Sequence, residues 1–318
     1  MKLNSVSYHI VVAGGAGFIG SNLCGRLLKD GHRVLCIDDL STGSIKNLDP
    51  LMEHEAFSFM KNNVIEPIRI EQDVDLIYNL ASPASPPMYQ QDPVRTFMTN
   101  VWGSFNLLEL ARRKDARILL ASTSEVYGDP LVSPQSETYW GNVNPNGLRS
   151  CYDEGKRAAE TLFCDYQREY NVDTRIVRIF NTYGPNMRYD DGRVVSNFIT
   201  QALTGRRLTM YGDGAQTRAF LYVDDLVEGL VRVMGDDVPH TPINLGNPHE
   251  MSVNELATMI RELLGADIEL EFDSLPSDDP RRRCPDITTA TDLLGGWVPS
   301  VCLEEGLART IDYFKKVI

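Results

Sequence analysis

Short apolar segments alternate with longer amphipathic ones through the first half of this 318-residue chain. The apolar segments read HIVVAG, RVLCID, VDLIYNLA, RILLAS and DTRIVRIFN, and the amphipathic ones cover residues 17–30, 93–113 and 150–170. Strands that alternate with helices form a parallel sheet with helices on both faces. The alternation therefore predicts an α/β protein with a Rossmann-type, doubly wound parallel sheet.

The pattern loosens beyond residue 180, where Gly, Pro and Asp clusters separate shorter segments. We interpret this region as a smaller C-terminal α/β domain that returns some elements to the first one. The first domain is expected to cover residues 1–180 plus about 219–248, and the second residues 181–218 plus 249–318. At this length, with 42% hydrophobic residues, the chain can bury a large core.

The composition excludes several classes of partner. A formal charge of −13 disfavours nonspecific binding to nucleic acid or to an anionic membrane. The sequence has no run of about 18 apolar residues, and its first residues lead into a strand rather than a signal peptide, so we expect a cytoplasmic protein. Its six cysteines show no C-x-x-C spacing, which predicts reduced thiols and no metal site.

A glycine-rich turn follows the first predicted strand. Gly14, Gly17 and Gly20 are spaced G-x-x-G-x-x-G where a helix begins, and the next strand ends in Asp38. Glycine lets the backbone approach a pyrophosphate, which the N–H groups and dipole of the helix attract. A carboxylate about 20 residues further on can bind both hydroxyls of an adenosine ribose, and it would repel a 2′-phosphate. The pattern predicts a site for NAD rather than NADP.

Tyr152 and Lys156 lie four residues apart at the start of a predicted helix, so their side chains share one face. A neighbouring ammonium stabilises a phenolate and would move the pKa of the tyrosine toward neutrality. With NAD in place, Tyr152 could take a hydroxyl proton while hydride leaves the same carbon. The pair predicts a dehydrogenase-type active site.

These motifs resemble those of the extended short-chain dehydrogenase/reductase superfamily. Within it, the chain is similar to the UDP-glucuronate decarboxylase (UDP-xylose synthase) family, from about residue 10 to residue 314. The segments that carry the similarity are LASPASPPMYQQDP, LLASTSEVYGDP, PQSETYWGNVNP, CYDEGKRAAE, RIFNTYGP, DGRVVSNFI, YGDGAQTRAFLYVDDL and NLGNP. The resemblance implies that the first domain binds NAD and the second a nucleotide sugar.

Carried over residue by residue, the resemblance implies three groups of site residues. The catalytic group comprises Thr123, Ser124, Glu125, Tyr152, Lys156 and Arg283. The residues expected to bind the cofactor are Gly14, Gly17, Phe18, Ile19, Gly20, Asp38, Asp39, Thr42, Asn63, Val64, Leu80, Ala81, Ser82, Thr99, Tyr152 and Lys156. Those expected to bind the substrate are Pro83, Tyr89, Asn181, Arg193, Tyr211, Gln216, Arg218 and Arg283.

Two positions depart from the family pattern. Asn63 stands where the family usually has Asp, and Cys284 with Pro285 follows the arginine where the family usually has Lys-Pro. An asparagine can still accept a hydrogen bond from an adenine amino group, so at most a weaker adenine contact is expected. The second departure leaves Arg283 intact.

The implied reaction explains why a redox cofactor serves a reaction without net redox. Oxidation at C4 of a hexuronic acid places a ketone β to the C6 carboxylate, and the ketone accepts the electrons released with carbon dioxide. Protonation at C5 and return of hydride to C4 would then give UDP-xylose. Arg283 is expected to contact the carboxylate or the charge that develops on the sugar.

Three other functions remain open from the sequence. A 4,6-dehydratase pattern has Asp-Glu where this chain has Ser124 and Glu125, and a 4-epimerase pattern typically lacks the glutamate. An NAD-binding protein without turnover would not need these residues together with Tyr152 and Lys156. The segments 93–113 and 150–170 resemble helices that form a dimer interface in this superfamily, so a homodimer is expected.

Overall fold

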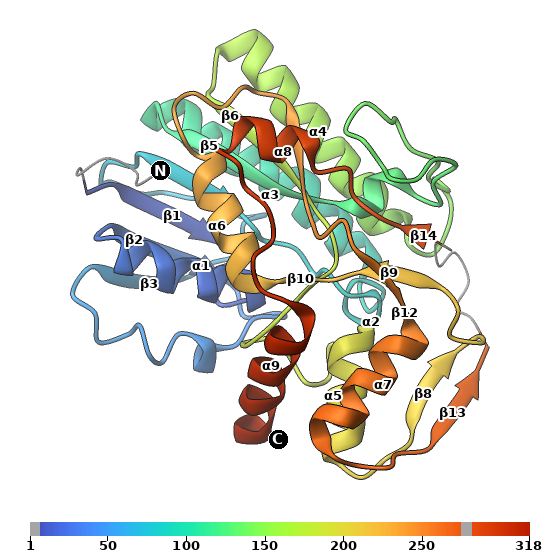
Figure 1. Cartoon of the computed structure of the whole chain (residues 1–318). Coiled ribbons are helices and arrows are strands. Elements are labelled where there is room, and N and C mark those ends of the chain that lie inside the picture. Colours follow the sequence, from blue (N-terminus) through green and yellow to red (C-terminus); the bar gives the residue numbers. More distant parts are fainter. Residues whose placement is uncertain (1–6, 275–281) are drawn as a thin grey trace.

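A seven-stranded parallel sheet forms the centre of the molecule in the computed structural model, which describes residues 7–274 and 282–318 (Figure 1). The strands follow one another across the sheet as β11 (Pro242–Leu245), β6 (Thr174–Ile179), β5 (Arg117–Thr123), β4 (Leu76–Asn79), β1 (His9–Ala13), β2 (Arg33–Asp38) and β3 (Phe57–Lys61). The chain begins in the middle and moves outward on each side. This order confirms the predicted doubly wound α/β fold.

Helices cover both faces of this sheet. Alternate strand residues point to opposite sides: Ile10 and Val12 pack in the core with α1 (Phe18–Lys29) and α6 (Val223–Val233). Val11 and Ala13 pack in the core with α3 (Pro93–Lys114) and α4 (Ser150–Tyr170). Figure 1 shows these two layers in front of and behind the sheet. Because both faces are apolar, polar groups that meet a ligand can gather only at the ends of the strands.

The later part of the chain builds small sheets beside the central one. β9 (Thr217–Ala219) lies between β12 (Glu250–Ser252) and β14 (Arg282–Arg283), and β8 (Leu208–Tyr211) pairs with β13 (Leu270–Asp273). The remaining elements are α2 (Pro86–Tyr89), α5 (Val194–Leu203), α7 (Val253–Leu264), α8 (Thr288–Leu293), α9 (Leu303–Val317), the pair β7 (Thr182–Tyr183) and β10 (Leu221–Tyr222), and the 3-10 turns η1 (Ile45–Asn47) and η2 (Ser124–Tyr127). α8 contacts β11 of the central sheet, although it falls in the expected second domain. The domain boundaries stay a prediction.

The described residues contain neither a membrane-spanning helix nor a metal-binding cluster. None of the helices seen there combines the length and the apolar character needed to cross a bilayer. Within the same residues, no group of His, Cys, Asp and Glu is arranged to hold a metal ion. All six cysteines are free thiols. The expected location in the cytoplasm stays a prediction.

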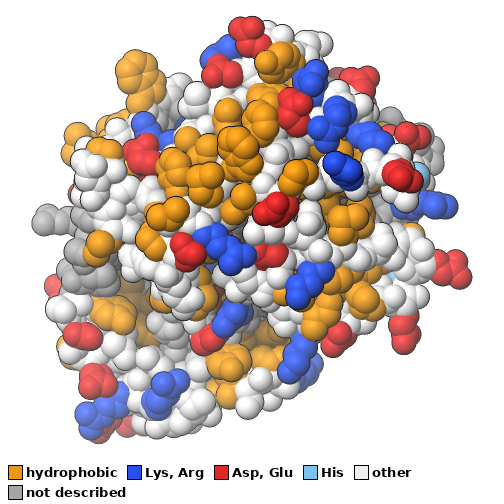
Figure 2. Space-filling view, turned by 180° about the vertical axis from the view of Figure 1, so that it is seen from behind, with side chains coloured by type: hydrophobic (Ala, Val, Ile, Leu, Met, Phe, Trp, Pro, Cys, Tyr) orange, Lys and Arg blue, Asp and Glu red, His pale blue; other side chains and the backbone are white. Residues whose placement is uncertain are grey.

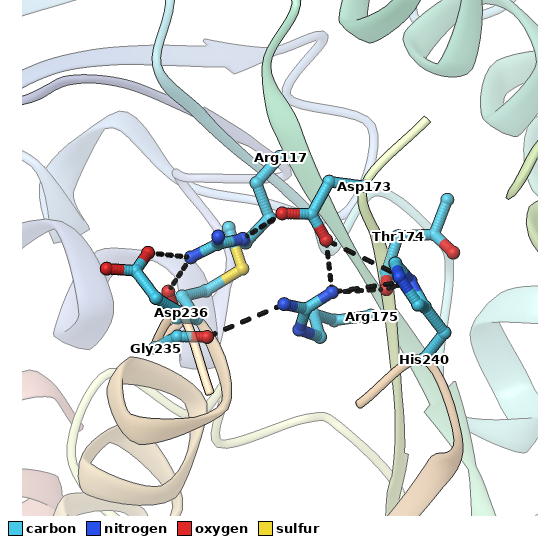
Figure 3. Close-up of polar contacts among 8 residues, drawn as sticks. Arg117, Asp173, Thr174, Arg175, Gly235, Asp236 and His240 are labelled. Carbon is cyan, nitrogen blue, oxygen red and sulfur yellow. Dashed lines mark hydrogen bonds and ion pairs between the residues drawn. The ribbon is translucent and has the colours of Figure 1, made fainter. Parts of the chain in front are cut away.

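Two arginines, one buried and one partly buried, join the strands at the edge where β5 and β6 begin (Figure 3). Asp173 accepts a hydrogen bond of 2.6 Å from Arg117 Nε and forms an ion pair with Arg175, whose side chain is only 3% exposed. Arg117 also pairs with Asp236 at 3.1 Å, in the loop after α6, and Arg175 NH1 lies 3.4 Å from His240 Nδ1. Asp173 is therefore the anion shared by both arginines.

Replacing this shared anion should lower stability. In Asp173→Asn, two partly buried guanidinium groups lose a counter-charge, and we expect the free energy of unfolding to fall by about 2 kcal/mol. This is less than for a fully buried pair, because the Asp173 side chain is 38% exposed. Urea denaturation measures the free energy of unfolding. The control Asp165→Asn breaks the exposed pair with Arg168 and should change stability by less than about 0.5 kcal/mol. Equal stability of the two variants would show that the cluster contributes nothing.

Candidate active site

The glycine-rich turn forms where β1 ends and α1 begins. Gly14 has φ +79° and donates a backbone hydrogen bond of 2.8 Å to the carbonyl of Ile37. A Cβ atom on Gly20 would lie 2.2 Å from the carbonyl oxygen of Gly14, and one on Gly14 would lie 2.7 Å from the backbone of Leu80. The turn can therefore close only with glycine at these two positions.

The residues around this turn fit a dinucleotide. Gly17 is the N-cap of α1 and provides no side chain to cap it, so the first-turn N–H groups, including those of Phe18 and Ile19, lie at a helix end that attracts anions. A pyrophosphate needs this combination of a close backbone approach and unpaired N–H donors. The geometry supports the predicted phosphate-binding turn.

Asp38 ends β2 beside this turn. Its carboxylate accepts hydrogen bonds from the backbone N–H of Ala16 at 2.9 Å and of Leu40 at 2.8 Å. Burial raises its pKa, and these two hydrogen bonds oppose the rise. Asp39 points elsewhere, because it pairs with Arg95 of α3 at 2.8 Å. Asp38 therefore lies where the prediction needs a carboxylate, whereas Asp39 joins β2 to α3.

Other residues expected at the cofactor make local contacts. Asn63 Oδ1 accepts a hydrogen bond of 3.0 Å from the backbone N–H of Ile65, so its acceptor already takes part in a turn. The hydroxyl of Thr99 donates 2.8 Å to the carbonyl of Arg95 in its own helix. The rest of this group lies in the segments after β2, β3 and β4, namely Thr42, Val64, Leu80, Ala81 and Ser82. Their roles stay predictions.

Thr123 and Tyr152 meet at the end of β5. Thr123 caps η2 by accepting a hydrogen bond of 3.2 Å from the N–H of Glu125. Its side chain also lies close enough to Tyr152 to lower the pKa of the tyrosine. Burial raises the pKa of Tyr152 to about 12, although Thr123 and the charge of Arg193 oppose the rise. The expectation of a tyrosine pKa near neutrality is therefore wrong for the protein without ligands, because burial outweighs the nearby cations.

Lys156 lies one helical turn after Tyr152 on the same face of α4. Its Nζ donates a hydrogen bond of 2.9 Å to the carbonyl of Ala121 in β5 and lies 5.9 Å from the centre of the Tyr152 ring. Burial lowers the pKa of Lys156 to about 7, against the opposing charge of Glu160. Near neutral pH this lysine can therefore be charged or neutral, and an anionic group brought beside it would favour the charged form.

Tyr89 lies on the other side of Tyr152. The two rings stack with centroids 5.1 Å apart and planes 3° apart. Tyr89 is 1% exposed, and its hydroxyl is buried without a hydrogen-bond partner in the described structure. The stack fixes the orientation of the Tyr152 ring. The predicted contact of Tyr89 with substrate stays a prediction.

Two arginines hold Glu125. Arg283, in β14, contacts both carboxylate oxygens, one of them at 2.9 Å from NH2, and Arg149 NH2 lies 2.5 Å from Oε2. Burial alone would raise the pKa of Glu125, but the charges of Arg283 and Arg149 lower it to about 2. Glu125 is therefore ionised throughout the neutral pH range. No motif in the sequence indicated Arg149, whose only signal was its place one helical turn before Tyr152.

Asp153 is a second residue that the sequence analysis missed. It is buried, and its Oδ1 has no hydrogen-bond partner in the described residues. Burial and the negative charge of Glu125 raise its pKa to about 7, against the effects of Arg149 and Arg283. The structure thus places an ionised carboxylate near a carboxyl group that can be either protonated or ionised at neutral pH.

The arginines expected at the substrate lie near this group. Arg218 of β9 pairs in register with Arg283 of β14. Arg193 forms an ion pair with Asp191, lies 6.0 Å from the centre of the Phe18 ring, and interacts electrostatically with Tyr152. The structure therefore brings Arg193 between the start of α1 and the catalytic residues.

Other predicted substrate residues contact their own neighbourhoods. Gln216 Nε2 donates a hydrogen bond of 2.8 Å to the carbonyl of Tyr211 across the turn between β8 and β9. The carbonyl of Asn181 accepts one of 2.9 Å from the N–H of Leu221. Ser124 is buried, and the carbonyl of Pro83 accepts a hydrogen bond from Ser82. In the described structure no hydrogen bond or ion pair joins Gln216, Asn181 or Pro83 to the catalytic side chains, and the roles of these residues and of Ser124 stay predictions.

Comparisons with known proteins agree with this geometry. The model of the NAD dependent epimerase/dehydratase family matches residues 10–246. The chain is 55% identical to UDP-glucuronic acid decarboxylase 1 of Xenopus tropicalis over 96% of its length and 72% of the relative, and 55% identical to UDP-glucuronic acid decarboxylase 5 of Arabidopsis thaliana over 99% and 91%. A UDP-glucuronic acid 4-epimerase from Bacillus cereus, solved with UDP-glucuronic acid and NAD, superposes with a TM-score of 0.88 at 29% identity and covers 98% of this chain and 100% of its own.

The glycine turn gives a direct test of the dinucleotide site. In Gly20→Ala the new methyl group collides with backbone that cannot move aside, so we expect NAD affinity to fall by at least about tenfold and stability by about 1–3 kcal/mol. Isothermal titration and thermal unfolding measure these changes.

The control for this variant lies on the same helix. A Cβ atom on Gly25 would meet only Leu51, at 3.7 Å, so Gly25→Ala should keep NAD affinity and gain up to about 1 kcal/mol of stability. If both variants bound NAD equally well, the turn would not be the cofactor site.

Proposed function

This chain belongs to the NAD dependent epimerase/dehydratase family, and from that premise we propose that it is a UDP-glucuronate decarboxylase that releases carbon dioxide and makes UDP-xylose. The observation that carries the proposal is the meeting of Glu125, Arg283, Thr123 and Tyr152 at one end of the sheet. Identities of 53–55% to UDP-glucuronic acid decarboxylases over nearly the whole chain support it.

The proposed cofactor is NAD, held by the glycine turn, the start of α1 and Asp38. When bound, NAD would supply reversible hydride removal at C4 of the sugar. A C4 ketone lies β to the C6 carboxylate, so carbon dioxide can leave with its bonding electrons received by the ketone oxygen. The protein must then orient the sugar, manage the proton of the C4 hydroxyl and protonate C5.

Tyr152 and Thr123 are the groups proposed to bind the C4 hydroxyl. The two side chains already lie beside each other at the end of β5, and the stacked ring of Tyr89 holds Tyr152 in place. Tyr152 Oη would accept the hydroxyl proton and later return it. Because burial raises its pKa, a charged Lys156 is needed to make the phenolate accessible during turnover.

Glu125 and Arg283 are proposed to act beside C5 and C6. Two guanidinium groups keep Glu125 ionised, so in this arrangement it can accept a proton or orient a water molecule but cannot donate a proton. The Nε of Arg283 is buried without a partner in the described structure and remains able to donate a hydrogen bond. These groups suit a reaction in which negative charge develops on the sugar.

The neighbouring activities of the family fit these residues less well. A 4,6-dehydratase needs an acid that protonates the leaving C6 hydroxyl, and Ser124 stands where that pattern has an aspartate. A serine cannot serve as that acid at neutral pH. A 4-epimerase needs no group that deals with lost carbon dioxide, whereas Glu125 and Arg283 are built into this site as a buried pair.

Turnover tests the proposal directly. The purified protein, given UDP-glucuronate and catalytic NAD without added reductant, should release carbon dioxide and yield UDP-xylose, detected by mass spectrometry and NMR. An unchanged mass with an inverted C4 would identify an epimerase instead. Glu125→Gln should lower kcat by about 100-fold or more with little change in NAD affinity. Glu154→Gln, which alters a more exposed carboxylate that faces Arg157, is the control and should turn over normally.

A homodimer through α3 and α4 is the proposed assembly. Figure 2 shows hydrophobic side chains gathered on the face that lies behind the sheet in Figure 1. Large exposed hydrophobic residues on α3 support an interface there, namely Val94, Phe97, Met98 and Trp102. Contiguous exposed apolar side chains of this kind mark interaction surfaces.

The mass of the protein in solution tests this assembly. Light scattering should give twice the chain mass, and Trp102→Glu should weaken the dimer by about 30-fold or more, because it places a charge among apolar side chains. Phe272→Glu changes a more exposed aromatic residue on β13 and should leave the mass unchanged. A monomeric wild-type protein would contradict the proposed dimer.

A further inference from the structure

The two arginines that contact Glu125 make different numbers of hydrogen bonds to it. Arg283 contacts both carboxylate oxygens, whereas the contact from Arg149 is made by one nitrogen on one oxygen. Arg283 belongs to β14, which pairs with β9, and its side chain is 5% exposed. Arg149 is the N-cap residue of α4, its side chain is 11% exposed, and it follows Leu148, which is 70% exposed. Of the two contacts with Glu125, the one from Arg149 breaks with the loss of a single hydrogen bond to that carboxylate.

The proposed substrate brings a second carboxylate to the same place. In a hexuronic acid, C5 carries the carboxylate and is bonded to C4, whose hydroxyl is expected at Thr123 and Tyr152. Glu125 follows Thr123 by two residues and donates its own backbone N–H to the Thr123 hydroxyl. The sugar carboxylate and Glu125 therefore approach each other in a buried site, where two anions repel unless a cation stands between them.

A guanidinium group is suited to this position, because it can donate hydrogen bonds to two carboxylates from different edges. Two nitrogens of Arg283 already contact both oxygens of Glu125, which leaves Nε as its nitrogen without a partner in the described structure. We propose that Arg149 is a specificity-determining residue: when substrate binds, its guanidinium passes from Glu125 to the carboxylate of the sugar, so that the site selects the acid over the neutral sugar. This inference rests on the proposed function.

The exchange also changes Glu125. Two cations now lower the pKa of Glu125, and the exchange leaves Arg283 as the one in direct contact. Its pKa then rises only while an acidic sugar is bound, which makes Glu125 a better proton acceptor when carbon dioxide can be lost. The same movement of Arg149 thus binds the acidic substrate and raises the pKa of Glu125.

Comparison of substrate and product tests the inference, because UDP-xylose differs from UDP-glucuronate by the carboxylate. In Arg149→Gln, we expect KM for UDP-glucuronate to rise about 10- to 100-fold, the range for a lost hydrogen bond to a charged group. The inhibition constant of UDP-xylose should change by less than about threefold, since no contact with it is lost. Arg149→Lys keeps the charge and should recover part of the lost affinity for the acid.

The controls separate this inference from others. Arg168→Gln removes an exposed arginine from the same helix and should change neither constant. If Arg149→Gln does not fold, the selective loss must appear in Arg149→Lys. Equal changes for acid and product, or no change for either, would overturn the role of Arg149. A wild-type protein that releases no carbon dioxide from UDP-glucuronate would overturn the proposed function, and the inference with it.

Discussion

The buried contact between Arg283 and Glu125 joins two parts of the chain that are 158 residues apart. Glu125 comes from the end of β5 in the central sheet, and Arg283 from β14 in the small sheet beside it. Removal of two charges from water costs several kcal/mol for each ion, and their attraction offsets this only with good geometry. The pair is therefore better understood as the device that fixes the position of the small sheet over the strand ends than as a source of stability.

The parallel sheet explains why the site lies where this contact forms. Both faces of the sheet are covered by apolar helices, so the exits of β1, β2, β4 and β5 at one edge are the available places for polar loops. The glycine turn, Asp38 and Thr123 all lie at these exits. The opposite edge carries the cluster of Arg117, Asp173 and Arg175, which binds strand to strand (Figure 3).

Local patterns in the sequence were sufficient for part of this description. The sheet, the glycine turn and Asp38 follow from strand-helix alternation and from spacing within a short segment, where backbone geometry decides the outcome. Arg149 and Asp153 could not be found in this way. Their interactions with Glu125, a direct contact for Arg149 and an electrostatic effect for Asp153, depend on how α4 meets the end of β5. Neither hydrophobic periodicity nor motif spacing encodes that approach.

The pKa of Tyr152 shows a second limit of sequence reasoning. The spacing of Tyr152 and Lys156 correctly placed both side chains on one face of α4, but it carried no information on burial. Burial disfavours charge on both residues: it raises the pKa of the phenol and lowers that of the amine. Proximity alone would have suggested mutual stabilisation of the charged forms. The depth of the pair in the protein decides its state without ligands.

Two groups of the site, Asp153 and Lys156, are in an unfavourable electrostatic state near neutral pH, whereas Glu125 is not. The pKa of Glu125 falls from 4.5 to about 2, so its pairing stabilises the fold above that range and is lost as the pH falls through it. The pKa of Asp153 rises from 3.8 to about 7, so the fold holds the extra proton and loses stability as the pH rises across that window. The pKa of Lys156 falls from 10.5 to about 7, so the unfolded chain binds the extra proton and stability increases with pH between these values.

The contributions of Asp153 and Lys156 are thus both least favourable near pH 7. A bound anionic ligand that favours charged Lys156 would relieve part of this strain, which couples occupancy of the site to stability of the fold.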